Sequence, residues 1–418
     1  KAYWDDGSQL VPPHDKNVID EVKKVQVSDI KFEGVPEMIT ILGKDFDKKY
    51  LDKVKTLSLS PEAIQKEHDL KIVFTPLHGT TYELVPASLR NWGFTNIHTV
   101  PEQSIPDGDF PTVASANPEE PAAFKMALDL ARKIDADLAM ACDPDGDRIG
   151  IAVKNDAGEW TLLNGNQTNI IFTEYIIRRK KELNQLKGGE YTVKTIVTTE
   201  LIKDIAEKNH IICYDVYTGF KWIADVIRKE GGEKFIGGGE ESFGYMPGAF
   251  TRDKDGVSAT SLMAEIAAWV KMQNKTLYSF LKEIYAKYGF SQERMIYIVR
   301  KGLSGAQEIK AMMEEFRHNT PKEINHSPVV LKKDYLSLEA TNLQTGEKTH
   351  LNFETKSDVL QFFLADGSKI SVRPSGTEPK IKFYFEGRAQ MKDMNDYDRA
   401  QQDANARIDA IIKDLKLQ

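Results

Sequence analysis

The sequence contains very little cysteine. Cys142 and Cys213 are the only two among its 418 residues. Two cysteines cannot build the disulfide framework of a small secreted domain, and their scarcity favours a reducing compartment. The sequence also contains no apolar run that approaches the length of a membrane span. We therefore predict a cytoplasmic protein without a membrane partner.

An excess of positive charge is absent as well. The 56 Lys and Arg residues are outnumbered by 63 Asp and Glu residues, which gives a formal net charge of -7. This balance predicts no nucleic-acid partner, and any anion site must be local. The 41% of hydrophobic and 28% of charged residues are typical of a folded globular protein. At this length the chain has room for about three domains.

Strand-like and helix-like patterns alternate from Leu70 to about Tyr288. The alternation predicts an α/β fold with parallel or mixed sheets, whose ligands bind at the carboxyl ends of the strands. Residues 1–66 offer too little apolar sequence for a core of their own, and after about Gly302 the pattern changes to a helix, several short strands and a terminal helix. The elements expected between these segments are strands at 71–74, 96–100, 138–142, 195–198, 211–214 and 234–236 and helices at 81–91, 118–134, 165–181, 200–208, 257–272 and 276–288.

Three carboxylates stand at alternate positions between two apolar runs. The turn from Asp143 to Arg148 also contains Asp145, Gly146 and Asp147. The pattern predicts a strand, a tight turn and a second strand. Ionised carboxylates this close repel one another unless a cation lies between them, and oxygen ligands select a hard ion, Mg²⁺ before Ca²⁺ or Mn²⁺. The three Asp residues are therefore candidate metal ligands.

Two other interpretations of this turn stay open on the residues alone. It can be an acidic surface turn, since Asp and Gly favour turns, although its flanks have the sequence of buried strands. It can also belong to an aspartyl-phosphate phosphatase with Asp143 as the nucleophile. An EF-hand is excluded by spacing, because Arg148 and Lys154 stand where such a loop needs its Gly and its bidentate Glu.

Two further turns carry groups suited to a phosphorylated sugar. Near the C-terminus, Arg373, Ser375, Gly376 and Thr377 supply a forked cation, two hydroxyls and closely spaced backbone N–H groups, which suit a phosphate dianion. The other turn follows Gly237-Gly238-Gly239, where Glu240 and Ser242 offer an acceptor and a donor for vicinal sugar hydroxyls. A simple glycine-rich turn between a strand and a helix is the structural alternative for the second segment.

Together these loops resemble the phosphoglucomutase/phosphomannomutase (α-phosphohexomutase) superfamily, and the resemblance covers essentially the whole chain. Members of this family have three α/β domains and a smaller α+β domain around one cleft. They move a phosphoryl group between the C1 and C6 oxygens of a hexose through a phosphoserine and a sugar bisphosphate. The segments that carry the resemblance are Asp143–Arg148 (Asp-Pro-Asp-Gly-Asp-Arg), Thr218–Lys221 (Thr-Gly-Phe-Lys), Gly239–Ser242 (Gly-Glu-Glu-Ser) and Arg373–Pro379 (Arg-Pro-Ser-Gly-Thr-Glu-Pro).

The resemblance implies an order of domains. A remnant of a first α/β domain is expected at residues 1–66. Two complete α/β domains with mixed sheets follow, at 67–187 with the metal loop and at 188–305 with the sugar-binding loop. A C-terminal α+β domain at 306–418 carries the phosphate-binding loop.

Carried over residue by residue, the resemblance also implies roles. It makes Asp143, Asp145 and Asp147 the ligands of Mg²⁺ and places Arg148 beside the transferring phosphoryl group. The other implied substrate contacts are Glu240 and Ser242 to the sugar hydroxyls, Thr218, Gly219, Lys221 and Lys254 around the ligand, and Arg373, Ser375, Gly376 and Thr377 at the phosphate that does not react.

The sequence departs from the family pattern in two places. In one branch a His follows the Ser of the sugar loop, whereas Phe243-Gly244-Tyr245 follows here, which favours the branch with glucose preference. The family's phosphoserine lies in a Ser-His-Asn-Pro loop, and these 418 residues contain no such sequence. In the family that loop is followed by a Lys and a strand, which Lys1-Ala2-Tyr3-Trp4 resembles. We therefore expect the chain to begin just after its nucleophile, with Lys1 as candidate general acid or base.

The implied activity of the full-length parent is the interconversion of glucose 1-phosphate and glucose 6-phosphate. Mg²⁺ is the implied cofactor, glucose 1,6-bisphosphate the activator and intermediate, and small-molecule sugar phosphates the partners, while this chain alone is expected to be inactive. Phosphomannomutase or phosphopentomutase activity is an alternative, because Glu240 and Ser242 do not reveal the orientation of the C2 hydroxyl. An alternative from another class is a non-catalytic phosphosugar-binding protein.

Overall fold

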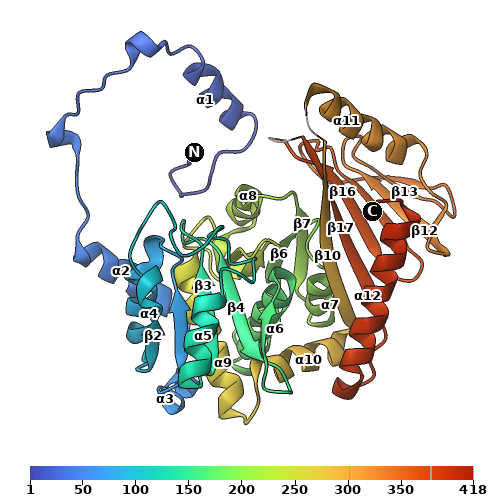
Figure 1. Cartoon of the computed structure of the whole chain (residues 1–418). Coiled ribbons are helices and arrows are strands. Elements are labelled where there is room, and N and C mark those ends of the chain that lie inside the picture. Colours follow the sequence, from blue (N-terminus) through green and yellow to red (C-terminus); the bar gives the residue numbers. More distant parts are fainter. Residues whose placement is uncertain (301, 377–378, 418) are drawn as a thin grey trace. The chain divides into compact units, whose positions relative to one another are not determined.

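The computed structural model describes residues 1–300, 302–376 and 379–417. The chain divides into two compact units, Lys1–Leu281 and Lys282–Gln418. Each unit is built on strands that, among the described residues, pair only within that unit (Figure 1). Each unit also has its own buried core. Within the described ranges, no helix combines the length and the apolar character needed to cross a membrane.

The first sheet of the N-terminal unit has five strands in the order β2-β1-β3-β4-β5. Strand β1 pairs in parallel with β2 and β3, whereas β3, β4 and β5 pair antiparallel. Strands β1 and β3 are buried at every position, as expected for apolar runs covered on both faces. Helix α5 packs on β1 and β3. The bounds are β1 Ile72–Thr75, β2 Ile97–Thr99, β3 Leu138–Cys142, β4 Ile149–Lys154, β5 Trp160–Leu163, α4 Leu84–Trp92 and α5 Lys125–Ile134.

The second sheet has four strands in the order β7-β6-β8-β9. Strand β6 pairs in parallel with β7 and β8, and β9 returns antiparallel to β8. Helix α6 starts with a capping box in which Asn164 and Gln167 exchange side-chain to backbone hydrogen bonds. The bounds are β6 Tyr191–Thr195, β7 Ile212–Val216, β8 Phe235–Gly239, β9 Tyr245–Met246, α6 Gly165–Glu182, α7 Leu201–Lys208, α8 Phe220–Glu230, α9 Gly256–Met272 and α10 Leu277–Tyr288.

Two elements expected from the sequence have different bounds in the structure. The strand expected at 195–198 is β6, which ends at Thr195, and the backbone N–H of Thr198 closes a turn onto the carbonyl of Thr195 at 3.0 Å. The β-branched residues from Thr195 to Thr198 are all buried, but those after Thr195 do not belong to a strand. Their residue types therefore indicate burial in this segment and not strand pairing. The helix expected from Pro118 begins at Lys125, after a series of turns that includes Pro121. Proline lacks the N–H that a continuing helix needs.

Residues 1–66 form no core of their own, as their sparse apolar content predicts. Helix α1 (His14–Val22) has no buried residue, and large apolar side chains between Val18 and Phe46 are exposed. Helices α2 (Lys44–Lys55) and α3 (Pro61–Lys66) pack on α4 and α9, respectively. The buried side chains of α2 and α3 are therefore covered by α4 and α9 and not by a core of this segment.

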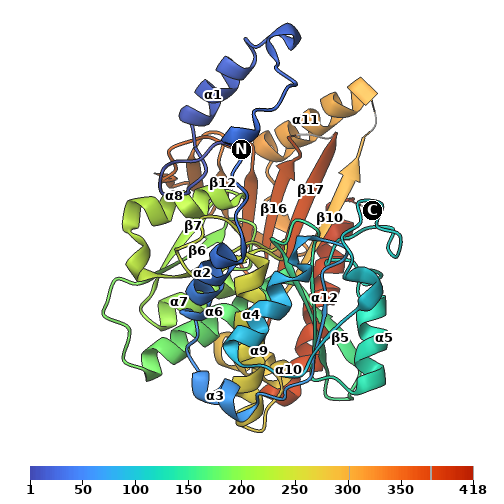
Figure 2. The ribbon, with the colours of Figure 1, turned by 90° about the vertical axis from the view of Figure 1, so that its left-hand side faces the viewer.

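The C-terminal unit is an antiparallel sheet covered by two helices. Its strands follow the order β10-β17-β16-β15-β12-β13-β14, and β11 pairs with β12. Figure 2 shows β10, β17 and β16 side by side. Helix α12 packs on β10 and β17 and buries the apolar stripe predicted from its helical spacing. The bounds are α11 Gly302–His318, α12 Tyr397–Asp414, β10 Phe290–Val299, β11 Glu323–Ile324, β12 Ser327–Asp334, β13 Glu339–Asn342, β14 Lys348–His350, β15 Leu360–Leu364, β16 Lys369–Pro374 and β17 Lys380–Ala389.

The predicted fold class is confirmed. Two α/β sheets of mixed strand direction precede an α+β unit. The two turns that carry the candidate site, after β3 and after β8, both belong to the N-terminal unit.

Candidate functional site

The acidic turn lies where the sequence predicts, between the paired strands β3 and β4. Asp143 organises it, because Oδ1 of its carboxylate accepts hydrogen bonds from the backbone N–H groups of Asp147 and Arg148, both at 3.0 Å. Gly146 has a φ of +76°, a conformation that favours glycine. The turn is thus held in shape by its own first carboxylate.

Asp143 and Asp147 repel each other in this turn, and Asp147 also forms an ion pair with a lysine. Burial raises the pKa of Asp143, and the charge of Asp147 raises it further, against the hydrogen bonds from the backbone N–H groups. Asp147 is paired with Lys254, whose Nζ lies 2.9 Å from its Oδ2. Burial alone would lower the pKa of Lys254, but its hydrogen bond to Asp147 and the neighbouring carboxylates outweigh burial and raise that pKa. Asp145 is exposed.

The donor set of the turn fits a hard cation in its chemistry. Asp143, Asp145 and Asp147 offer only oxygen ligands, and the charge of Asp147 helps to raise the pKa of Asp143, a repulsion that a divalent cation would relieve. In the part of the chain that the structure describes, no three His, Cys, Asp or Glu side chains already converge on a metal position. The side chains of the turn therefore offer oxygen donors of the right kind but are not prearranged as a cluster.

Arg148 is oriented by a carboxylate that sequence analysis did not single out. Its Nη1 donates a hydrogen bond to Oε1 of Glu119 at 2.9 Å, and its Nε lies 3.8 Å from Oδ2 of Asp143. The sequence predicts a helix from Pro118, and nothing local indicates which cation the carboxylate of Glu119 contacts. Glu119 is a positioning residue for Arg148.

The glycine-rich segment turns between two strands and not from a strand into a helix. Strand β8 ends at Gly239, and the backbone N–H of Glu240 closes the loop onto the carbonyl of Gly244 at 3.0 Å before β9 begins. Oε1 of Glu240 accepts a hydrogen bond from the backbone N–H of Gly219, and Oγ of Ser242 lies 3.4 Å from Oε2 of Glu240. The structure therefore brings Gly219, Glu240 and Ser242 together, with Thr218 directly before Gly219 at the start of α8.

Glu240 is buried in a setting that disfavours its charge. Burial, reinforced by the charge of Glu241, raises the pKa of Glu240 to about 7. The N–H of Gly219 and the charges of Lys254 and Arg148 act in the opposite direction. Because Lys254 and Arg148 act on Glu240, the acidic turn and the sugar loop share one electrostatic environment.

Backbone contacts join the acidic turn directly to the sugar loop and to helix α9. The N–H of Ile149 donates to the carbonyl of Phe243 at 3.0 Å, and the N–H of Gly256 donates to the carbonyl of Gly146 at 2.9 Å. A Cβ atom added to Gly256 would lie 2.6 Å from that same carbonyl oxygen, so a larger residue does not fit there. These contacts hold the loops after β3 and β8 against each other.

Lys254 connects the two loops through its side chain. A Cβ atom added to Gly244 would lie 2.3 Å from Cδ of Lys254, so the lysine passes over a glycine. Its ammonium lies 5.1 Å from the ring centroid of Phe220, the first residue of α8, and reaches Asp147. The sequence predicted Lys254 as a ligand contact, and the structure places it between the acidic turn and the sugar loop.

Two other predicted cations pair with carboxylates at the edge of this arrangement. Nζ of Lys221 lies 3.2 Å from Oδ2 of Asp15. Nζ of Lys1 lies 3.2 Å from Oδ2 of Asp253, and its side chain is 52% exposed. Since Asp253 directly precedes Lys254, Lys1 lies next to the site, whereas Lys221 is drawn toward the N-terminal segment.

Two more residues that sequence analysis missed support the loops. Nδ2 of Asn169 on α6 donates to the carbonyl of Glu240 at 2.8 Å, and the sequence has no local signal for this contact because it crosses 71 positions. Asp255 caps α9 by accepting from the N–H of Val257 at 3.0 Å, and it also accepts from the hydroxyl of Tyr50 at 2.8 Å. The position of Asp255 just before a helix is a recognisable N-cap signal.

The fourth predicted loop belongs to the C-terminal unit. Arg373 lies near the end of strand β16, where it stands opposite Lys382 of β17, and the N–H of Ser375 donates to the carbonyl of Lys380 at 2.8 Å. Arg373 and Ser375 are half-buried and Gly376 is exposed. Thr377 lies outside the described residues. The turn thus presents a guanidinium, a hydroxyl and a glycine at the end of a strand pair, as the sequence predicts.

Three family models match the chain along most of its length. "Phosphoglucomutase/phosphomannomutase, alpha/beta/alpha domain II" matches residues 48–158, and the corresponding domain III matches residues 164–288. The C-terminal domain of the same family matches residues 316–401. The chain belongs to the phosphoglucomutase/phosphomannomutase family.

Curated relatives agree with this assignment. A phosphoglucomutase of Staphylococcus aureus (strain N315) is 35% identical over 412 residues, which cover 98% of this chain and 72% of the relative. The phosphoglucomutase of strain USA300 is 35% identical over 388 residues, covering 92% of this chain and 69% of the relative. The predicted family, the predicted enzyme class and the predicted likeness to phosphoglucomutase are confirmed.

Solved structures confirm the fold. The open form of pp63/parafusin, a phosphoglucomutase from Paramecium, superposes with a TM-score of 0.61 at 18% identity, covering 90% of this chain and 61% of that one. A putative phosphomannomutase from Thermus thermophilus gives a TM-score of 0.58 at 17% identity, covering 89% of this chain and 65% of that one. This chain therefore spans less than two thirds of the length of either structure.

Proposed function

We propose that this chain provides the metal, sugar and phosphate sites for phosphoglucomutase activity, the interconversion of glucose 1-phosphate and glucose 6-phosphate through glucose 1,6-bisphosphate. The observation that carries the proposal is the single arrangement formed by the acidic turn, Lys254 and the loop of Glu240 in the N-terminal unit. The relatives named phosphoglucomutase support glucose as the sugar. Phe243-Gly244-Tyr245 after Ser242 supports the same choice, as argued from the sequence.

The acidic turn would bind the reacting phosphoryl group through a metal ion and through Arg148. Asp143, Asp145 and Asp147 would hold Mg²⁺, which when bound neutralises charge that develops on a transferring phosphoryl group. Arg148 adds a forked donor beside the same group, and its ion pair with Glu119 holds the guanidinium in place before substrate arrives.

The sugar loop would orient the hexose. The carboxylate of Glu240 accepts hydrogen bonds from ring hydroxyls, and the hydroxyl of Ser242 donates or accepts beside it. Thr218, Gly219, Lys221 and Lys254 would contribute further contacts, and Lys1 would act as general acid or base. Because Glu240 is already held by the N–H of Gly219, it needs little reorganisation when the sugar binds.

The turn of the C-terminal unit would bind the phosphate that does not react. Arg373, Ser375, Gly376 and Thr377 carry the donor set of a phosphate site. The domain boundaries at 66, 187 and 305 stay predictions, and so does the cytoplasmic location. The same proposal expects sugar phosphates as partners and expects neither nucleic acid nor membrane.

The geometry of Asp143 weighs against the aspartyl-phosphate alternative. Its Oδ1 already accepts two backbone hydrogen bonds that shape the turn, so this oxygen would have to give them up to attack a phosphoryl group. The 418 residues contain no Ser-His-Asn-Pro sequence to carry the phosphoryl group. The chain by itself is therefore expected to bind sugar phosphates without transferring phosphate.

Labelled glucose 1,6-bisphosphate tests the proposal. We expect reversible binding of the label in the presence of Mg²⁺, no covalent label on the chain and no interconversion of glucose 1-phosphate and glucose 6-phosphate. Asp143→Asn is the matched variant for the alternative. Stable label that Asp143→Asn abolishes would establish an aspartyl-phosphate enzyme, and the absence of any binding of the bisphosphate would remove the phosphosugar site altogether.

A further inference from the structure

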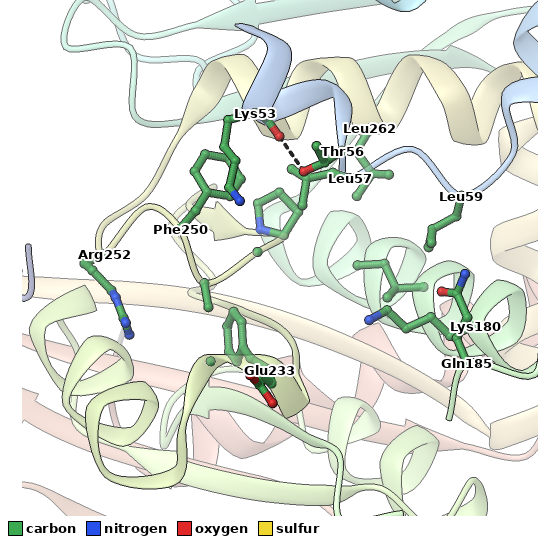
Figure 3. Close-up of a pocket in the computed structure, with 16 residues that line it drawn as sticks. Lys53, Thr56, Leu57, Leu59, Lys180, Gln185, Glu233, Phe250, Arg252 and Leu262 are labelled. Atoms are coloured by element: carbon green, nitrogen blue, oxygen red, sulfur yellow. Dashed lines mark hydrogen bonds between the residues drawn. The ribbon is translucent and has the colours of Figure 1, made fainter. Parts of the chain in front are cut away.

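A pocket separate from the sugar-phosphate site lies within the N-terminal unit (Figure 3). Its volume is about 450 Å³, enough for a small metabolite. None of the residues assigned above to metal, sugar or phosphate lines it. Its walls come from the connection between α2 and α3, the end of α6 and the following residues, the start of β8, the segment after β9, and one residue of α9.

Lys180 provides the central charge of this pocket. It stands in the last turns of α6, and Figure 3 shows its ammonium directed toward the middle of the pocket. Burial lowers the pKa of Lys180, and the charge of Glu190 offsets this only in part. Within the described residues, its ammonium makes no hydrogen bond and no ion pair.

The carboxylate that acts on the charge of Lys180 and the carboxylate that lines its pocket are engaged elsewhere or exposed. Glu190 accepts hydrogen bonds from the backbone N–H of Lys187 and from that of Gly188, the latter at 3.0 Å. Glu233, the one carboxylate among the described pocket-lining residues, is exposed. Lys180 is half-buried and has no counter-ion in the described part of the chain, so it leaves a positive charge in the pocket that a bound anion would compensate.

Two more cations line the same pocket. Nη1 of Arg252 is buried and donates no hydrogen bond to the part of the chain that the structure describes. The charge of Arg252 acts on Asp6, but the carboxylate of Asp6 accepts its hydrogen bonds from Ser8. Lys53 is exposed, and its Nζ lies 6.0 Å from the ring centroid of Phe250. Among its described lining residues, the pocket therefore carries three cations against one carboxylate.

Apolar side chains separate these cations. They include Leu57, Ile176, Phe235, Pro247 and Leu262, and four of the five are buried in the unliganded chain. Inorganic phosphate alone would leave such walls without contact, whereas a short carbon skeleton would cover them. The ligand chemistry that fits is a small organic acid with more than one anionic group.

We propose that this pocket binds a short organic dianion, with one acidic group paired to Lys180 and its carbon skeleton against the apolar walls. The shared chemistry of the ligand is two anionic groups a few carbon atoms apart. Carboxylates alone, or a carboxylate with a phosphate, satisfy it equally. The site is independent of the proposed mutase activity, because it uses none of that site's residues.

Calorimetric titration of the 418-residue chain with three probes tests the proposal. Succinate carries two carboxylates, phosphoglycolate a carboxylate and a phosphate, and succinamide is the neutral analogue of the first. We expect at least one of the acids to bind and succinamide not to bind. Glucose 1-phosphate should not displace the bound acid. Failure of both acids to bind, or their displacement by glucose 1-phosphate, would overturn the assignment.

Substitutions at two neighbouring lysines separate a ligand-binding role from a structural one. Lys180→Met should weaken binding of the acid by about tenfold or more, because one charged hydrogen bond is lost. Lys181→Met removes an exposed lysine from the same helical turn and should leave binding unchanged. If both variants weaken binding of the acid equally, the effect comes from the overall loss of positive charge. That result would contradict a specific site at Lys180.

The melting temperature of each variant without ligand supplies the second readout. Removing an uncompensated, half-buried cation should leave the Tm of Lys180→Met equal to or above that of the parent chain. A structural role at the C-terminal end of α6 predicts the reverse, since a cation there stabilises the helix. A clearly lower Tm combined with unchanged acid binding would therefore overturn the proposal.

Discussion

Nζ of Lys254 lies 2.9 Å from Oδ2 of Asp147, so the third carboxylate of the acidic turn is already neutralised by a lysine from the segment before α9. The same lysine passes over Gly244 of the sugar loop and acts on the charge of Glu240. A single side chain thus couples the proposed metal ligands to the proposed sugar contacts. Any cation that binds the turn must compete with this pair.

This competition leads to a first prediction. Lys254→Met should strengthen Mg²⁺ binding, because Asp147 becomes free to coordinate, by roughly 1 kcal/mol or about fivefold for a partly exposed pair. The same variant should weaken binding of glucose 1,6-bisphosphate. Calorimetry with each ligand measures both effects, and Lys254→Arg serves as the charge-preserving control. Unchanged Mg²⁺ affinity in Lys254→Met would exclude Asp147 as a ligand.

Asp145 offers a test of the metal site with little structural disturbance. Its side chain is exposed at the tip of the turn, so Asp145→Asn should leave the melting temperature nearly unchanged. Mg²⁺ affinity should fall by about tenfold or more, because a neutral ligand replaces an anionic one on a hard cation. Asp156→Asn, in the exposed turn between β4 and β5, is the matched control. Equal affinities in the two variants would contradict the assignment.

Glu240 should make the stability of the fold depend on pH. Its pKa is about 7 in the folded chain and 4.5 in the reference state, so the folded chain binds more protons between these values. Stability therefore decreases as the pH rises from about 4.5 to about 7, and the cost is fully present above that window. Glu240→Gln should be more stable than the parent at pH 8 by about 1–3 kcal/mol and similar to it at pH 4.

Denaturant unfolding at the two pH values measures this difference. The amide oxygen of Gln can still accept the hydrogen bond from Gly219, so the loop should keep its shape. Glu233→Gln, at an exposed position, controls for the general effect of removing a negative charge. Parallel pH profiles for Glu240→Gln and the parent would show that Glu240 does not titrate in this window.

Arg373 tests the turn of the C-terminal unit. Arg373→Lys keeps the charge but loses the fork, so binding of glucose 1-phosphate should weaken by about 1–3 kcal/mol if the phosphate is held in a bidentate manner. Arg399→Lys makes the same exchange at an exposed position of α12. Calorimetry should separate the two variants, and identical affinities would mean that phosphate does not bind at this turn.

Local sequence patterns determined the parts of this protein whose signals are short-range. The acidic turn lies between two strands because apolar runs flank it on both sides, and α12 buries the stripe that its helical spacing predicts. The strand expected at 195–198 and the helix expected from Pro118 were misplaced. In those segments burial and turn formation override the local preference for an extended or helical chain.

The tertiary structure alone decided which side chains meet. Glu119 and Arg148 are 29 positions apart, Asn169 and Glu240 are 71 apart, and Tyr50 and Asp255 are 205 apart. No periodicity or motif reports such pairs, because each depends on the path of the chain through two sheets. The path of the chain also leaves Lys180 without a counter-ion among the described residues. The sequence determined that carboxylates, glycines and cations occur in the right loops, and only the packing of those loops decided that Lys254 lies between Asp147 and Glu240.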